Sequence, residues 1–300
     1  MDTTTLRAAF RRFAAALFLL LFAAAAAAGD KLFLWEVRGQ ANSVFLLGTV
    51  HFWKAEDYPL PAPIEEAFSR ARVLAVELDP TLPQARELIL RHALYGPGDG
   101  LDRHLPAALL ADAKQAAAGF GLDERFVLQS KPWLLSTVLV AAAAARFGYS
   151  AEAGMDARLV ARARRDGKRI VELESAELQV ALFESLSPQE QSLFVRQAVD
   201  LLRENGAARL FDRFAAAWRQ GDTEGLEALE RLGLQNEPLA DGFLQRTVVD
   251  RNRAMAEKIA QLLESGEPAL VAVGAAHLVG KGSVVELLGA RGYSVRQVER

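Results

Sequence analysis

Two short stretches decide the fold of this 300-residue chain: SVFLLGTVH at Ser43–His51 and ALVAVGAAH at Ala269–His277. Each begins with an apolar run typical of a buried strand and continues directly into a Gly-x-x-His turn. A helix and a further strand are predicted to follow, at residues 64–70 and 73–78 in the first case and at 282–290 and 293–298 in the second. We interpret the two ends of the chain as similar strand–GxxH–helix–strand units.

The pattern predicts an α/β protein with a central mixed sheet. The apolar run Leu32–Val37 precedes the first unit and is expected to form a hairpin with it across the turn Gly39–Asn42. Helical spacing dominates from about residue 82 to 264, interrupted by one predicted strand at Arg169–Leu173. We expect residues 30–300 to form one domain, with this helical segment inserted between the two units. The predicted helices are Leu82–Leu94, Pro106–Gly119, Lys131–Phe147, Gly154–Asp166, Ala176–Leu186, Pro188–Asn205 and Asn252–Glu264.

Residues 1–28 are typical of a signal peptide. Three arginines (Arg7, Arg11 and Arg12) precede the uncharged run Phe13–Ala28, which ends in small residues suited to cleavage. This run has 16 residues, fewer than the ~20 needed to span a membrane, and no cysteine follows for a lipid anchor. The sequence therefore predicts a periplasmic or secreted protein with no stable membrane anchor after cleavage. An uncleaved N-terminal anchor is the alternative.

The composition excludes several kinds of site. The chain has no cysteine, so disulfides, thiolate metal sites, iron–sulfur clusters and cysteine nucleophiles are ruled out. The formal net charge is −3 and no basic domain is present, so we predict no nucleic-acid partner. Hydrophobic residues make up 51% and charged residues 24%, a composition typical of a globular protein.

His51 and His277 are two of only four histidines, and they occupy equivalent places in the two units. The carboxyl ends of parallel strands open onto a crevice where ligands bind. A glycine there is expected to allow a sharp turn at positive φ, so that the histidine three residues later points into the crevice. Imidazole is a common metal ligand and a base near neutral pH. We predict a functional site at this pair; the alternative is that each histidine only caps a turn.

Glu77 lies at the end of the predicted strand 73–78 and is the candidate third ligand or general base. A salt-bridged strand end is the alternative for this residue. Asp79 is a weaker candidate, because Asp-Pro often only begins a turn. His92 and His104 belong to no comparable motif and are predicted to lie on the surface.

Five strings, in this order, match a known family: LLGTVHFW (Leu46–Trp53), VELD (Val76–Asp79), GMDARLVARARRDGKRIVELES (Gly154–Ser175), RNRAMAEKI (Arg251–Ile259) and VAVGAAHLVGKGSVVELLGARGYSV (Val271–Val295). On these strings the chain resembles the TraB/GumN family, which is related to the Tiki metalloproteases and more distantly to erythromycin esterases. The resemblance implies an α/β core with a helical insertion and a metal-dependent hydrolase site. It places the paired histidines at His51 and His277 and the strand-end acid at Glu77. It also draws attention, without assigning roles, to Asp156, Glu174, Arg251 and Asn252.

Together these inferences predict an exported, peptidase-like hydrolase. His51 and His277 would bind a divalent metal, with Glu77 as third ligand or as the base that accepts a proton from water. Arg251 or Asn252 would stabilise the developing oxyanion. A nitrogen and oxygen site without sulfur suits manganese, cobalt or zinc. The substrate is a peptide or a small molecule that the sequence does not identify. Two alternatives stay open: a metal-independent, esterase-like hydrolase, and a protein that binds a peptide or polysaccharide without turnover.

Overall fold

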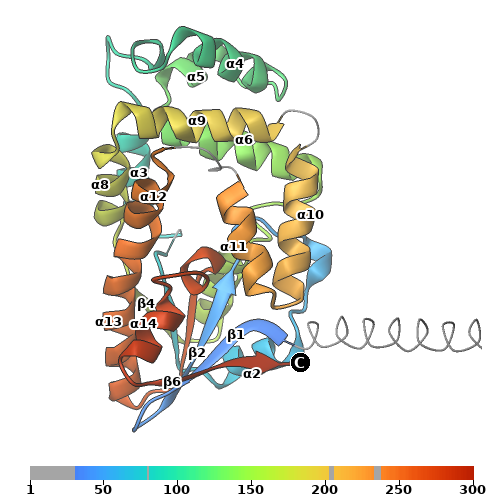
Figure 1. Cartoon of the computed structure of the whole chain (residues 1–300), viewed down its shortest axis with the longest axis vertical. Helices are drawn as coiled ribbons and strands as arrows, with labels where there is room; N and C mark the ends of the chain where they lie inside the picture. Colours follow the sequence, from blue (N-terminus) through green and yellow to red (C-terminus); the bar gives the residue numbers. More distant parts are fainter. Residues whose placement is uncertain (1–30, 80, 203–205, 233–237) are drawn as a thin grey trace, which may run out of the picture.

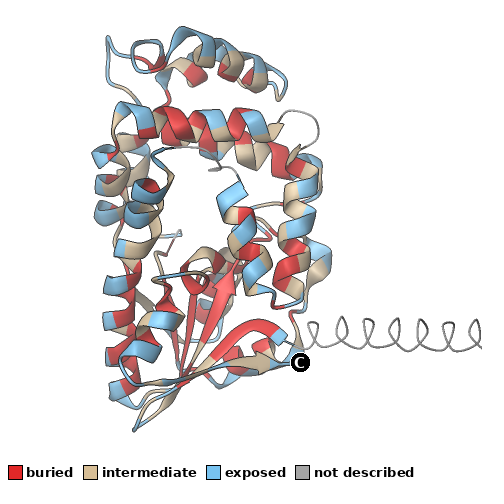
Figure 2. Ribbon diagram, viewed as in Figure 1, coloured by how far each residue is buried: buried red, intermediate tan, exposed pale blue. Residues whose placement is uncertain are grey.

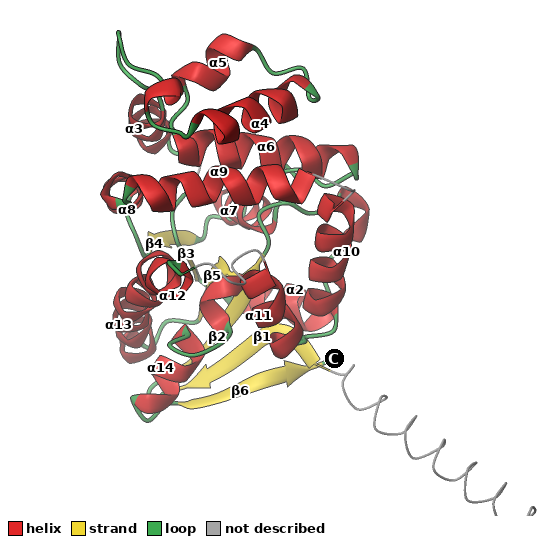
Figure 3. Ribbon diagram, turned by 45° about the horizontal axis from the view of Figure 1, so that its top comes forward, coloured by secondary structure: helices red, strands yellow, loops and turns green. Residues whose placement is uncertain are grey.

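The computed structural model describes residues 31–79, 81–202, 206–232 and 238–300. It confirms the α/β prediction: helices surround a six-stranded mixed sheet of order β4-β3-β5-β2-β1-β6 (Figures 1 and 3). The predicted signal peptide lies outside the described residues. Among the helices of the described part, none combines the length and apolar composition needed to cross a membrane.

The strands agree closely with the sequence pattern. Their bounds are β1 Lys31–Arg38, β2 Ser43–Thr49, β3 Val73–Val76, β4 Arg169–Glu172, β5 Ala269–Gly274 and β6 Ser294–Glu299. β1 and β2 form the predicted antiparallel hairpin, and β1 is also antiparallel to β6. The remaining pairs, β2–β5, β5–β3 and β3–β4, are parallel. The middle of the sheet is therefore parallel and apolar on both faces, which explains why its strands are continuous apolar runs.

Most predicted helices are present, with ends shifted by one or a few residues, and the last residues of the helix predicted at Pro188–Asn205 lie outside the described part. The helices are α2 Ala62–Arg70, α3 Pro83–Ala93, α4 Ala107–Ala118, α5 Glu124–Gln129, α6 Pro132–Arg146, α7 Met155–Arg165, α8 Ala176–Ser185, α9 Pro188–Leu202, α10 Gly206–Arg219, α11 Thr223–Leu232, α12 Ala240–Leu244, α13 Asp250–Ser265 and α14 Val284–Ala290. A π-helical turn at Gln245–Val249 joins α12 to α13. The sequence analysis missed α5, α10, α11 and α12.

The connections of β2 and β5 create a crevice at the centre of the sheet. From β2 the chain passes through α2 to β3, beyond β5; from β5 it passes through α14 to β6, beyond β2 and β1. The two connections leave neighbouring parallel strands in opposite directions, an arrangement that opens a crevice at the carboxyl ends of those strands. Thr49 pairs with Gly274 at the end of the β2–β5 ladder. The two GxxH turns therefore begin side by side.

Buried side chains form one large core around the sheet and a second in the helical part. Phe33, Leu46 and Val271, fully buried, belong to the sheet core. Leu135 and Leu139 of α6 belong to the second core, which α4, α5 and α9 share. Burial follows the strands and the inward faces of the helices (Figure 2). β2 points towards the helical part, so the carboxyl ends of the central strands face it (Figure 1).

Neither motif glycine has the positive φ that was expected, but Gly48 is required for space. Gly48 lies within β2, and Gly274 has φ −50° and ψ 138°, a conformation that any residue can adopt. A Cβ on Gly48 would lie 2.4 Å from the Phe33 ring and 3.2 Å from the Cα atom of Ala275. Gly48 thus allows the second GxxH turn to pack against the end of β2.

Candidate functional site

The crevice brings the two GxxH histidines and the strand-end acid to one point. A Cβ placed on Gly274 would lie 3.1 Å from Oε1 of Glu77, 3.8 Å from Cδ2 of His277 and 3.9 Å from Nε2 of His51. The side chain of His51 is 66% exposed, whereas that of His277 is 5% exposed and that of Glu77 13%. The convergence predicted for His51, Glu77 and His277 is therefore present in the fold, open to solvent on the His51 side.

His51 is held by the start of α7. Its Nδ1 lies 2.8 Å from Oδ2 of Asp156, whose other oxygen accepts a 2.6 Å hydrogen bond from the hydroxyl of Thr49. The backbone N–H of Met155 donates to the carbonyl of Val50, and this docks the first turn of α7 on the GxxH turn. A carboxylate can only accept, so Nδ1 of His51 carries the proton and Nε2 of the neutral ring presents its lone pair.

His277 is held in the same way by α13. Its Nδ1 lies 2.5 Å from Oδ1 of Asn252, and the amide nitrogen of Asn252 donates to the carbonyl of Gly282. Asn252 is 1% exposed, and both of its amide atoms are occupied. Because its oxygen faces the ring, Nδ1 of His277 is the donor, and in the neutral ring Nε2 is the acceptor, 3.6 Å from Oε2 of Glu77.

Glu77 is fixed by a network that joins three strand ends to α13. Its Oε1 accepts a 2.6 Å hydrogen bond from the backbone of Gly274, and its Oε2 accepts one from Arg251. Arg251 also donates to both oxygens of Glu174 and to the carbonyl of Thr247, in the π-helical turn. Arg251 therefore uses four of its five N–H groups on the protein, and it orients two carboxylates at once.

The charges of this network shift the pKa values of its members. The Asp156 carboxylate raises the pKa of His51 to about 9, and Glu77 adds to that effect. Burial by itself would raise the pKa of Glu77, but attraction to the protonated form of His277 and to Arg251 outweighs it and holds the pKa well below its usual range. Glu77 is therefore ionised at every ordinary pH.

The site has the donors and the charge balance that suit a divalent cation. Its three carboxylates (Asp156, Glu77 and Glu174) and one guanidinium leave two negative charges when both imidazoles are neutral. Both free Nε2 atoms face the same crevice, and each histidine is fixed through Nδ1 as ligands usually are. As they stand, however, the described residues contain no group of three or more His, Cys, Asp or Glu side chains able to hold a metal ion.

Other predicted residues lie elsewhere. Asp79 is buried next to β4, where it pairs with Arg164 and accepts from Thr81, so it does not face the crevice. His92 pairs with Glu184, and His104 pairs with Asp99 at the surface of the helical part. The sequence analysis missed Thr49, and it also missed Trp218 of α10, whose indole donates to the carbonyl of Gly48. Thr49 stands inside the GxxH motif, whereas no signal in the sequence links Trp218 to Gly48.

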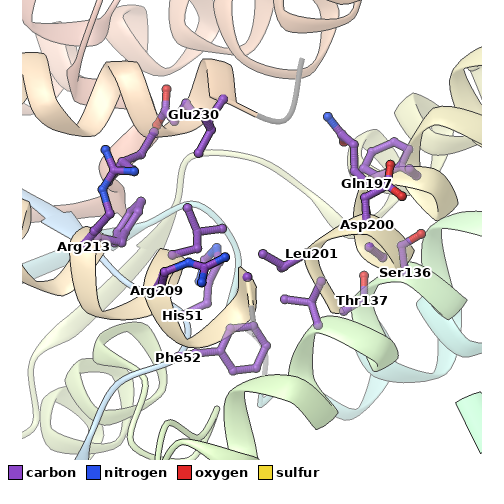
Figure 4. Close-up of a pocket in the computed structure, with 18 residues that line it drawn as sticks. His51, Phe52, Ser136, Thr137, Gln197, Asp200, Leu201, Arg209, Arg213 and Glu230 are labelled. Carbon is purple, nitrogen blue, oxygen red and sulfur yellow. The ribbon is translucent and has the colours of Figure 1, made fainter. Parts of the chain in front are cut away.

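A cavity of about 850 Å³ begins at His51. It extends between α6, α9, α10 and α11, and Phe52 lines it beside His51 (Figure 4). Its size is that of a small-molecule site, about 300–1,000 Å³. The crevice at the strand ends thus continues into a chamber built by the helical segment.

The Asp156–His51 pair predicts a pH-dependent stability. Because the folded-state pKa of His51 is about 9, above its ordinary 6.5, the pair stabilises the metal-free protein below pH 6.5. This contribution is lost as the pH rises through 9. Urea denaturation should therefore show that Asp156→Asn reduces the fall in unfolding free energy between pH 6.5 and about 9.5.

Asp99→Asn, which removes the surface pair with His104, is the matched control and should leave that fall unchanged. An equal fall in wild type and Asp156→Asn would show that Asp156 does not set the proton affinity of His51.

Comparison with known proteins identifies relatives along nearly the whole chain. The model of the TraB/PrgY/gumN family matches residues 33–297. The chain is similar to the uncharacterized protein YbaP of Escherichia coli K12, with 24% identity over 243 residues, which is 81% of this chain and 86% of YbaP. The YbaP protein of Shigella flexneri gives the same values. No solved structure matches the chain significantly.

Proposed function

Because the chain belongs to the TraB/PrgY/gumN family, we propose that it is an exported, metal-dependent hydrolase of the peptidase type. One observation carries the proposal: His51, Glu77 and His277 converge on Gly274, and each histidine is fixed through Nδ1 with Nε2 free. In this proposal His51 and His277 hold a divalent cation, manganese, cobalt or zinc. When bound, the cation lowers the pKa of a water molecule and polarises the carbonyl to be cleaved.

The other side chains of the site have separate roles in this proposal. Glu77, kept ionised by Arg251, would serve as the third ligand through the oxygen nearest His277, because a carboxylate with a strongly lowered pKa is a weak base. Arg251 and Asn252 act as positioning residues in this proposal, because their polar atoms are taken up by the protein. We therefore replace the oxyanion-binding role expected for them with orientation of Glu77 and His277.

The charge of His51 favours this proposal over a metal-independent mechanism. With a pKa of about 9, His51 of the metal-free protein carries a proton at neutral pH and cannot accept another. A cation competes for the same Nε2 atom and keeps the ring neutral. Activity should accordingly require a metal near pH 7.

The test is cleavage of a mixed peptide and ester panel, followed by mass spectrometry, with protein loaded with manganese, cobalt or zinc. We expect cleavage by wild type and a loss of roughly 100-fold or more in His277→Ala, because a ligand is removed. His104→Ala, a surface histidine outside the crevice, is the control and should retain activity. Cleavage that survives exhaustive chelation would favour the metal-independent hydrolase, and recovery of every bound ligand intact would favour the binding protein.

A further inference from the structure

The cavity beside His51 combines an apolar lining with two arginine side chains. Its walls include Phe194 and Leu201 of α9, Leu210 and Phe214 of α10 and Leu229 of α11. Arg209 and Arg213 lie one turn apart on α10 and both line the cavity (Figure 4). Neither forms a salt bridge or hydrogen bond with any side chain of the described residues, and both are exposed. Apolar walls and charged side chains in one chamber are typical of a ligand site.

The acidic groups around the chamber do not neutralise these arginines. Glu230 of α11 also lines it, and one of its carboxyl oxygens is buried without a hydrogen-bond partner. Burial, together with the nearby Glu227, raises the pKa of Glu230 to about 8, so this group is largely neutral at pH 7. Asp200, on the opposite wall, has interactions of its own. Among the described residues, therefore, no acidic group pairs with the two arginines of the chamber, and Glu230 supplies a protonated carboxyl donor.

We propose that this cavity binds a ligand with an apolar body and a carboxylate, which Arg209 and Arg213 hold beside His51. Two guanidinium groups one helical turn apart can bind a carboxylate with paired, charge-assisted hydrogen bonds. The apolar walls take up the body of the ligand, and the proposal rests on the proposed function in treating this ligand as the substrate. The shared chemistry fits both a fatty acyl chain and a short apolar peptide with a free carboxyl terminus.

Isothermal titration calorimetry distinguishes a fatty acyl ligand from a peptide ligand without requiring turnover. The acyl arm compares octanoate with octanol, and the peptide arm compares N-acetyl-Leu-Phe with its amide. We expect at least one carboxylate to bind ~10-fold or more tightly than its uncharged analogue, because its hydrogen bonds to the arginines are charge-assisted. Whichever carboxylate binds more tightly, octanoate or N-acetyl-Leu-Phe, identifies the class of ligand. Equal binding of each carboxylate and its uncharged analogue, or no binding in either arm, would overturn the proposal.

Substitutions at Arg209 and Arg213 test whether these side chains bind the carboxylate. Arg209→Gln/Arg213→Gln should abolish the preference for the carboxylate while leaving binding of the uncharged analogue unaffected, with folding checked by circular dichroism. Arg91→Gln, an exposed arginine on α3 outside the cavity, is the matched control and should bind as wild type. A double variant that keeps the preference would contradict the assignment.

His277→Ala separates the two proposals, because His277 does not line the cavity. It should bind the carboxylate normally even though hydrolysis is lost. Loss of carboxylate binding in this variant would place the anion at the strand-end crevice and overturn the arginine assignment. Carboxylate binding by wild type with no hydrolysis of any panel member would contradict the proposed function alone.

Discussion

Replacing Arg251 with methionine should destabilise the metal-free protein by about 3–5 kcal/mol, because it leaves two carboxylates buried without their cation. The side chains of Glu77 and Glu174 are 13% and 6% exposed, and Arg251 donates to both. Methionine retains the length of the aliphatic stem but supplies no charge. Urea denaturation at pH 7 measures the loss of unfolding free energy. This loss should be smaller at about pH 5, where carboxylates that have lost their cation take up protons.

Arg253→Met is the matched control on the same helix. Arg253 is 61% exposed and, among the described residues, forms an ion pair only with Asp250, itself 47% exposed, so its replacement should change stability by less than about 1 kcal/mol. A loss below about 1 kcal/mol in Arg251→Met as well would mean that Glu77 and Glu174 are not held by Arg251, and the positioning role would fail.

Gly274→Ala should strongly reduce hydrolysis while the protein stays folded. The backbone angles of Gly274 suit alanine, but the new methyl group would occupy the point where His51, Glu77 and His277 converge. It would press on Oε1 of Glu77 at 3.1 Å and displace any atom bound there. We expect a loss of roughly 100-fold or more in kcat/KM, since displacements of about 1 Å at a reacting centre have that effect.

Gly289→Ala provides the comparison, because an added Cβ on this α14 residue meets no atom within 4 Å. It should retain both activity and stability. Full activity in Gly274→Ala would place the chemistry away from the strand ends.

The sequence was most informative where structure is local. The apolar runs of β2 and β5 are each specified within six or seven residues, and the GxxH motifs follow them directly. Helix α11 was missed although it has a local start signal: the side chain of Asp222 accepts from the backbone of Gly225. The glycine inside its first turn weakened the helical pattern.

The contacts that define the site join residues far apart in the sequence, so the spacing of motifs along the chain could not predict them. Arg251 meets Glu77, 174 residues earlier, and Glu174, 77 residues earlier. Asn252 was a candidate for direct chemistry because an amide can bind an oxyanion. Only the folded arrangement shows that both of its amide atoms are already engaged, by His277 and Gly282.

The metal content of the folded protein shows whether His51 and His277 bind a divalent cation. Wild type and His51→Ala/His277→Ala would be purified without chelators or a histidine tag, checked by circular dichroism and analysed by plasma mass spectrometry. We expect near-stoichiometric manganese, cobalt or zinc in wild type and its loss in the folded double variant. No metal in wild type, even after incubation with all three ions, would contradict the proposed metal site.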